Sequence, residues 1–143
     1  MLAWLKDIFS PDTVGNAGER GERIAGEWLR RERGFSIVAR NWRSPRDRRD
    51  EIDLVGRDGE VLVFVEVKTR SAAALVPGFH AVDARKKRVL RRAAEAYLAA
   101  LSEKPLTFRL DVVEVVLPTA GSPSAPEVLH FENVALFGKH FRG

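Results

Sequence analysis

Cysteine is absent from this chain of 143 residues. Without thiols, the protein has no disulfide framework, zinc–thiolate site, iron–sulfur cluster or cysteine nucleophile. Long apolar runs are lacking as well, because no segment approaches the roughly 20 residues that a membrane-spanning helix needs. A chain without disulfides suits a reducing compartment. We therefore expect a cytoplasmic protein without a membrane span.

We do not expect the first residues of this sequence to act as a secretory signal peptide. The segment MLAWLKDIFSPDT holds a short apolar patch that Lys6 and Asp7 interrupt, without a basic leader or a small-residue cleavage site. We expect residues 1–14 to form an N-terminal arm packed on the domain. The alternative is an arm that contacts a membrane surface or a partner protein.

The composition predicts one globular domain. Hydrophobic residues make up 45% of the chain and charged residues 31%, as in ordinary globular proteins. A chain of this length holds a single core. We place the domain at residues 15–135, followed by a tail at 136–143.

Positive charge is in excess and unevenly distributed. The net charge is +4 and the pI is about 9.8. Two basic clusters contain Arg40, Arg43, Arg46, Arg48 and Arg49, and Arg85, Lys86, Lys87, Arg88, Arg91 and Arg92. Such clusters suit phosphate backbones, although solvated basic faces on an ordinary protein explain the charge equally well.

Hydrophobic periodicity predicts the element order α-β-β-β-α-β-β. The expected helices cover residues 17–33, ending at Gly34, and 83–101, capped by Asp83. The expected strands cover residues 35–42, 51–55, 60–69, 106–117 and 128–134. This order predicts the α/β class, with a mixed central sheet flanked by helices.

The second and third strands are predicted to form a hairpin. The Asp58-Gly59 pair between apolar β-branched runs is a strong turn signal. As a two-residue turn, it pairs Asp53 with Phe64 and Glu51 with Glu66. A four-residue loop gives the same pairs, whereas a three- or five-residue loop shifts one strand onto the other face.

This register places Asp53, Glu66 and Lys68 on one face of the sheet, because side chains alternate along a strand. The two carboxylates become diagonal neighbours, roughly 7–8 Å apart at the backbone, so both could reach one ion. Carboxylate oxygens and water suit Mg²⁺ or Mn²⁺, and the carbonyl of Val67 is the expected third ligand. Lys68 could orient or deprotonate the attacking water, or stabilise the phosphorane-like transition state.

A Glu-x-Lys motif alone is weak, since an exposed, alternating charged strand end explains the isolated motif better. The apolar run at residues 61–65 strengthens it, because a buried strand that ends in charge calls for a reason. The opposite face is predicted to be core, with Ile52, Leu54, Val61, Val63, Val65 and Val67. On the carboxylate face, Val55, Leu62 and Phe64 are apolar and charge follows.

Several short segments stand out together: Gly21-Glu22-Arg23-Ile24-Ala25, Arg40-Asn41-Trp42-Arg43, Glu51-Ile52-Asp53-Leu54-Val55, Phe64-Val65-Glu66-Val67-Lys68-Thr69-Arg70, Lys87 and Arg109-Leu110-Asp111-Val112-Val113. This ordered set resembles the YraN family of small, uncharacterised bacterial proteins. That family is similar to the PD-(D/E)xK nuclease superfold and to archaeal Holliday-junction resolvases. The resemblance implies a restriction-endonuclease-like core and action on DNA, with branched DNA among the candidates.

The resemblance also implies a fourth site residue, Glu22, beside Asp53, Glu66 and Lys68. A first-turn glutamate favoured by the helix dipole is the alternative explanation of Glu22. One position departs from the family, which usually has glycine where this chain has Asp50, and this leaves the role of Glu51 open. The expected nucleic-acid-binding residues are Arg43, Arg46, Arg48, Arg49, Arg70, Lys86 and Lys87.

The histidines and tryptophans give weaker evidence of a functional site. His80, His130 and His140 lack the spacing of metal ligands, and Trp4, Trp28 and Trp42 are expected to pack rather than to stack on bases.

Three hypotheses follow. The first is a Mg²⁺- or Mn²⁺-dependent nuclease acting on DNA, for which a homodimer is one arrangement. The second is a nucleic-acid-binding module that keeps the fold without the chemistry. The third is a protein-interaction adaptor that uses the apolar N-terminal arm.

Overall fold

The computed structural model describes residues 17–72 and 83–136, and it confirms the predicted α/β class and element order. The elements are α2 (Ala17–Arg33), β1 (Ser36–Arg43), β2 (Glu51–Asp58), β3 (Val61–Ser71), α3 (Ala84–Ala100), β4 (Thr107–Leu117) and β5 (Glu127–Phe131). The predicted N-terminal arm and nearly all of the predicted tail lie outside the described residues. No described helix is long and apolar enough to cross a membrane.

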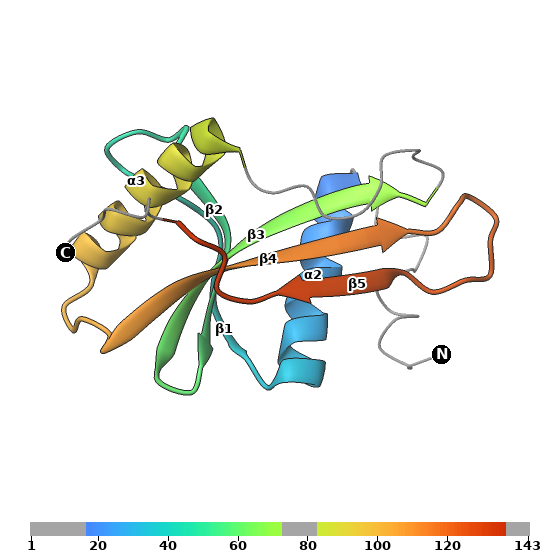
Figure 1. Cartoon of the computed structure of the whole chain (residues 1–143), viewed down its shortest axis with the longest axis horizontal. Coiled ribbons are helices and arrows are strands. Elements are labelled where there is room, and N and C mark those ends of the chain that lie inside the picture. The colour runs from blue at the N-terminus through green and yellow to red at the C-terminus, as the bar shows by residue number, and fades with distance from the viewer. Residues whose placement is uncertain (1–16, 73–82, 137–143) are drawn as a thin grey trace.

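The five strands form one mixed sheet in the order β1-β2-β3-β4-β5. Strands β3 and β4 are parallel, and every other neighbouring pair is antiparallel. The parallel pair needs a crossover, which contains α3. Figure 1 shows the central strands side by side, with α3 and α2 on opposite faces of the sheet.

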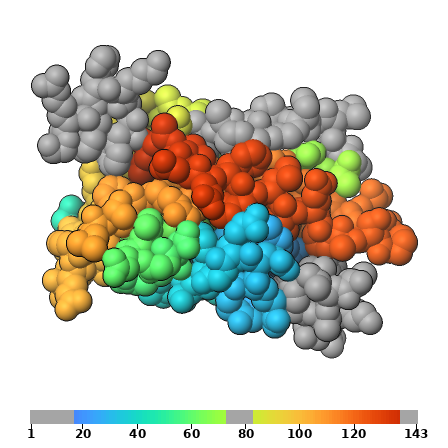
Figure 2. Space-filling view, turned by 60° about the horizontal axis from the view of Figure 1, so that its bottom comes forward, coloured from blue at the N-terminus to red at the C-terminus, as the bar shows by residue number. Residues whose placement is uncertain are grey.

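Helix α2 covers one face of the sheet with an apolar stripe that includes Ile24, Ala25 and Leu29. The helix ends at Gly34, whose φ of +70° is unfavourable for residues with a Cβ. The chain then turns back, and the Phe35 N–H donates to the Leu29 carbonyl at 3.1 Å. Figure 2 shows the end of this helix and the start of β1 (light blue) between the hairpin tip (green) and the β5 region (red).

Helix α3 covers the other face, but only the half near the starts of β3 and β4. Asp83 caps this helix by accepting from the Lys86 N–H at 2.8 Å. The apolar side chains of α3 pack on the sheet: Leu90, Ala93 and Ala94 share one core with Leu62, Phe64, Leu110 and Val112. Beyond this core, the same face of β3 changes to charged side chains that start at Glu66.

The predicted register of the hairpin is wrong by two residues. Asp58 pairs with Val61, so the turn is Gly59-Glu60 and Phe64 lies opposite Val55 rather than Asp53. Gly59 has φ +60° as the first turn residue, which is typical of a type II′ hairpin. A shift of two residues leaves the paired side chains, from Leu54 to Val65, on their predicted faces, because strand alternation has a period of two.

Strand β2 leaves β3 before it leaves β1. Pairing with β3 stops at Leu54–Val65, whereas pairing with β1 continues to Ile52 and Glu51. Asn41, on the neighbouring strand, has a left-handed φ of +49°. The alternation is interrupted here, so Ile52 packs in the α3 core rather than beside Leu54 as predicted.

The last strand is shorter than predicted. It ends at Phe131 because the chain turns at Asn133, whose φ is +54°. The Val134 N–H then donates to the Leu110 carbonyl at 2.7 Å.

Candidate metal centre

The side chain of Asp53 lies in the gap between β2 and β3. Its Oδ2 accepts from the Val67 N–H at 2.8 Å, so a carboxylate takes the place of a backbone partner. The N–H and C=O of a strand residue point to the same side in an antiparallel ladder. The Val67 carbonyl, predicted as a metal ligand, therefore faces the same gap as Asp53.

Glu66 is a buried carboxylate at the edge of the α3 core. Its relative exposure is 7%. Its Oε1 lies 3.3 Å from the Lys86 Nζ. Its Oε2 is buried without a hydrogen-bond partner among the described residues. A buried, unpartnered carboxylate oxygen is costly, and a cation would relieve that cost.

Two further carboxylates meet Asp53 from other directions. One oxygen each of Glu22, Glu51 and Asp53 lies within 4.8 Å of the other two, and all three residues are half-buried. Glu22 comes from α2, Glu51 from the start of β2. The structure thus brings the predicted Glu22, Asp53 and Glu66 to one region, with Glu51 beside them.

Glycine at position 21 lets α2 approach β3 closely enough to deliver Glu22. A Cβ on Gly21 would lie 1.8 Å from the Oγ1 and 2.9 Å from the Cβ of Thr69. Only a residue without a side chain fits this contact. Gly21 and Thr69 adjoin Glu22 and Lys68 in sequence, so the contact fixes the helix beside the carboxylates.

The clustered carboxylates retain protons more strongly than usual. Burial, then repulsion from Asp53 and Glu51, raises the pKa of Glu22 to about 7, although a hydrogen bond with Asn41 opposes the shift. Burial and then Asp53 raise the pKa of Glu66 to about 7 against the opposing charge of Lys86. Burial also raises the pKa of Asp53, opposed by the Val67 N–H. The cluster therefore favours uptake of protons or of a cation.

Lys68 follows Glu66 on the same face of β3, where α3 no longer covers the sheet. It is half-buried and makes no ion pair with another described residue. Arg70 comes next on that face and is paired with the buried Glu114 of β4. The structure thus keeps Lys68 beside the carboxylates without a carboxylate partner within the described ranges.

The predicted nucleic-acid-binding residues divide into two groups. Arg43 contacts Glu51 at 2.8 Å, Lys86 contacts Glu66, and Arg70 lies beyond Lys68, so these three border the carboxylates. The other four lie further along the loop and helix: Arg46, Arg48 and Arg49 are exposed, and Lys87 is half-buried in the first turn of α3. Arg49 is paired with Asp47.

Asp50 anchors the loop before β2. Its carboxylate accepts from the Arg92 Nε and Nη2 at 3.2 and 3.0 Å, and its exposure is 5%. Its backbone N–H and C=O bond to Asp47 and Ser44 within the loop. The side chain thus ties the entry of β2 to α3 and leaves Glu51 beside Asp53.

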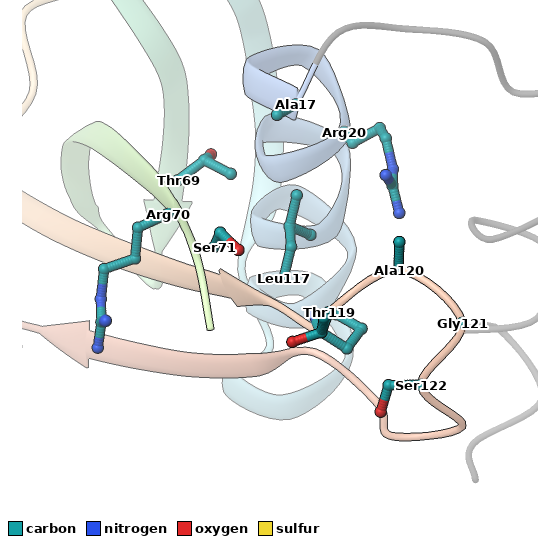
Figure 3. A pocket seen from close by; sticks show the side chains of 11 residues that line it. Ala17, Arg20, Thr69, Arg70, Ser71, Leu117, Thr119, Ala120, Gly121 and Ser122 are labelled. Atoms are coloured by element: carbon teal, nitrogen blue, oxygen red, sulfur yellow. The ribbon is translucent and has the colours of Figure 1, made fainter. Parts of the chain in front are cut away.

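Two hollows lie beside α2, and the first is lined by Glu22 of the carboxylate cluster. One of about 220 Å³ lies between α2 and β1 and is lined by Glu19, Glu22, Arg23, Arg40, Asn41 and Leu54. A second, of about 370 Å³, lies at the ends of β3 and β4, lined in part by Arg20, Thr69, Ser71 and Ser122. Figure 3 shows Arg20 pointing from α2 toward the loop at Ala120, across the second hollow. Solvent can therefore approach the α2 side of the cluster.

A separate network of buried hydrogen bonds around Asp111 was not predicted from the sequence. Asp111 is fully buried and accepts from the Arg109 Nε at 2.9 Å and the Asn133 N–H at 3.0 Å. His130 Nε2 lies 2.8 Å from the same carboxylate. His130, whose spacing does not suit a metal ligand, is thus a packed partner of Asp111. His80 and His140 lie outside the described residues.

Among the tryptophans, the expected packing is confirmed for two. Trp28 packs on the α2 core and Trp42 lies edge-on to Tyr97, with ring centroids 5.2 Å apart. Trp4 lies outside the described residues.

The chain is similar to many bacterial proteins of one family. The family model "Uncharacterised protein family UPF0102" matches residues 21–115. A UPF0102 protein of Beutenbergia cavernae is 47% identical over 117 residues, covering 82% of this chain and 93% of that protein. One from Symbiobacterium thermophilum is 50% identical over 98 residues, covering 68% and 80%. One from Geobacter sulfurreducens is 40% identical over 116 residues, covering 81% and 85%.

Proposed function

The chain belongs to the YraN-type uncharacterised protein family UPF0102, and we propose that it is a divalent-metal-dependent nuclease that hydrolyses phosphodiester bonds in DNA. The observation that carries this proposal is the position of Asp53 in the gap where β2 leaves β3, with Glu66 beside it. Branched DNA is the substrate class that the resemblance to junction resolvases brings forward.

The donor set fits a hard divalent cation. Asp53, Glu66 and the Val67 carbonyl offer oxygen atoms only, which favours Mg²⁺ or Mn²⁺ over softer metals. The unpartnered Oε2 of Glu66 supports the same assignment. Glu22 and Glu51 would complete the oxygen shell, directly or through water. A bound ion would lower the pKa of a water and offset charge on the scissile phosphate.

Lys68 is the residue assigned to the chemistry itself. Its ammonium shares the face of Glu66 and has no described carboxylate partner, so it can donate to a phosphate oxygen or hold the attacking water. Two positions further on that face, the Arg70 guanidinium is neutralised by Glu114, which makes Arg70 a weaker candidate for this role.

The substrate strand would pass over the basic side chains that border the carboxylates. The exposed arginines 46 and 48 lie on the loop before β2, and Lys87 lies at the start of α3. Lys and Arg contacts to phosphates carry no sequence information. The proposal therefore predicts recognition of nucleic-acid shape rather than of base sequence.

Cleavage assays test the proposal directly. Plasmid, single-stranded and four-way-junction DNA should be incubated with the protein and Mg²⁺, Mn²⁺ or EDTA. We expect metal-dependent cleavage of at least one substrate, reduced about 100-fold or more in Lys68→Ala, as for loss of a general acid–base group. The same low activity in wild type, Lys68→Ala and Asp53→Ala would trace any cleavage to a contaminant and refute the proposal.

A non-catalytic nucleic-acid-binding module is the second candidate, and the exposed arginines of the loop before β2 favour it. A pure binder should bind DNA with an affinity that falls steeply with salt and does not respond to Mg²⁺. Measuring DNA affinity with and without Mg²⁺ distinguishes the two candidates. In the metal-dependent nuclease, the carboxylate cluster repels phosphate unless Mg²⁺ is bound, so Mg²⁺ should raise the affinity.

A further inference from the structure

We propose that Lys86 is an internal counter-cation of the metal centre. Its ammonium neutralises Glu66 in the metal-free protein and moves to a phosphate of the substrate when a divalent cation takes that carboxylate. Lys86 would thereby couple metal binding to DNA binding. This inference rests on the proposed metal-dependent function and assigns Lys86 a role beyond simple attraction of DNA.

The two partners of the Lys86–Glu66 contact differ in solvent exposure. Lys86 Nζ lies 3.3 Å from Glu66 Oε1, and the lysine side chain is 42% exposed whereas the glutamate side chain is 9% exposed. Glu66 is held within the packed edge of the sheet. The ammonium is the partner that can leave, because it ends a flexible four-carbon stem.

The backbone of Lys86 is held in place, whereas its side chain is partly exposed. Its backbone N–H donates to the Asp83 carboxylate in the N-terminal cap of α3, so the Cα keeps its position. Rotation of the side chain alone can carry the ammonium away from Glu66. Its new position would still border the carboxylates, where a phosphate bound to the metal would lie.

A divalent cation and Lys86 cannot both neutralise Glu66 favourably. They compete for the charge of the same carboxylate, and two cations around one buried carboxylate repel each other. Lys86 therefore weakens metal binding in the free protein and strengthens DNA binding once metal is present. Linkage requires each ligand to improve the affinity of the other by the same factor.

Calorimetric titration with Mn²⁺ tests the competition. Wild type, Lys86→Met, Lys86→Arg and Arg85→Met should be compared at low ionic strength and about pH 8.5, where carboxyl groups with a pKa near 7 are ionised. Arg85 is exposed in the same turn, so its replacement removes one charge without touching Glu66. We expect Lys86→Met to bind Mn²⁺ about fivefold or more tightly than wild type, and the other two variants to match wild type.

The second measurement is the gain in DNA affinity that Mn²⁺ causes, with a phosphorothioate four-way junction that resists cleavage. We expect this gain to fall about fivefold or more in Lys86→Met and to persist in Arg85→Met. Tight Mn²⁺ binding by wild type with unchanged or weaker binding by Lys86→Met would overturn the role of Lys86 alone. Failure of wild type to bind Mn²⁺ would instead overturn the proposed metal centre.

Discussion

The Oδ2 of Asp53 accepts a hydrogen bond of 2.8 Å from the Val67 N–H, across the gap where β2 leaves β3. This bond does two things at once. It satisfies a donor that has lost its strand partner, and it directs a carboxylate into the sheet edge beside Glu66. Asp53 therefore serves both the proposed metal binding and the stability of the sheet edge. Different substitutions of Asp53 can test these two roles separately.

Asp53→Asn should abolish metal binding while preserving the fold. The asparagine carbonyl can still accept from the Val67 N–H, but the ligand loses its charge. We expect Mn²⁺ affinity to fall more than about 100-fold, beyond the loss typical of a residue outside the ligand shell. The melting temperature of the metal-free protein should stay unchanged or rise, because repulsion with Glu66 and Glu22 is relieved. Calorimetry and thermal melts measure the two effects.

Asp53→Ala serves as the matched comparison. It removes the acceptor as well as the charge, and the partly buried N–H of Val67 loses its partner at a cost of about 1–3 kcal/mol. A melting temperature equal to that of Asp53→Asn would show that the hydrogen bond to Val67 contributes little to stability.

Gly21→Ala should destabilise the protein by about 1–3 kcal/mol, the usual cost of overpacking. The new methyl group would overlap Thr69, whose Oγ1 lies 1.8 Å from the Cβ position. Thr69→Ala in the same chain should restore part of the loss, because it removes the Oγ1 and Cγ2 atoms. Urea unfolding of the two single variants and the double variant measures this coupling; strictly additive effects would contradict the predicted clash.

The metal-free protein should lose stability as the pH rises through 7. Burial and neighbouring carboxylates raise the pKa values of Glu22 and Glu66 from 4.5 to about 7. Between those limits the folded chain binds more protons than the unfolded chain, so the free energy of unfolding falls as pH rises. Melting temperatures at pH 5.5 and 8 should show this decrease.

Added Mn²⁺ should reverse that trend, since metal replaces protons on the same oxygens. Its stabilising effect should be larger at pH 8 than at pH 5.5. A double Glu22→Gln, Glu66→Gln variant provides the control, and its stability should vary less over this range. Equal pH dependence in variant and wild type would remove these two carboxylates as the cause.

Strand alternation was enough to place Glu66 and Lys68 on one face of β3, although the predicted turn was displaced, but it is interrupted at the end of β2 that carries Asp53. An error of two residues does not change the face, so the phase was secure where the register was not. The bounds of α2 were predictable because its apolar spacing and Gly34 are local signals. The proximity of the β2 and β3 carboxylates was predicted from the hairpin, whereas the addition of Glu22 from α2 came from the family resemblance.

Other features depend on tertiary structure and leave no local signal. The departure of β2 from β3 at Leu54 requires the Asp53 side chain to replace a backbone partner, and the left-handed Asn41 accompanies the changed orientation of Ile52. The Lys86–Glu66 contact depends on how α3 docks. Residues 20 positions apart on different elements show no periodicity that would reveal such a pair.

Asp111→Asn should lower the stability of the fold and leave metal binding unchanged, which is the opposite of the result expected for Asp53→Asn. Comparing the two variants distinguishes a metal ligand from a residue that only stabilises the fold. Burial alone would raise the pKa of Asp111, but hydrogen bonds from His130, Arg109 and the Asn133 N–H outweigh it and hold the pKa below the usual value. The ionised carboxylate thus stabilises the fold above its unfolded pKa, and that contribution is lost as pH falls through the folded pKa.

Replacing the Asp111 carboxylate with a neutral amide removes the buried negative charge that pairs with the Arg109 guanidinium. Breaking such a pair should lower the free energy of unfolding by about 3–5 kcal/mol. We expect a large fall in the urea midpoint of Asp111→Asn and unchanged Mn²⁺ affinity per folded molecule, measured below the unfolding transition. Loss of Mn²⁺ binding by folded Asp111→Asn would extend the metal centre through β4. Retention of binding there, with loss in Asp53→Asn, would locate the cation on the β2–β3 side of the sheet.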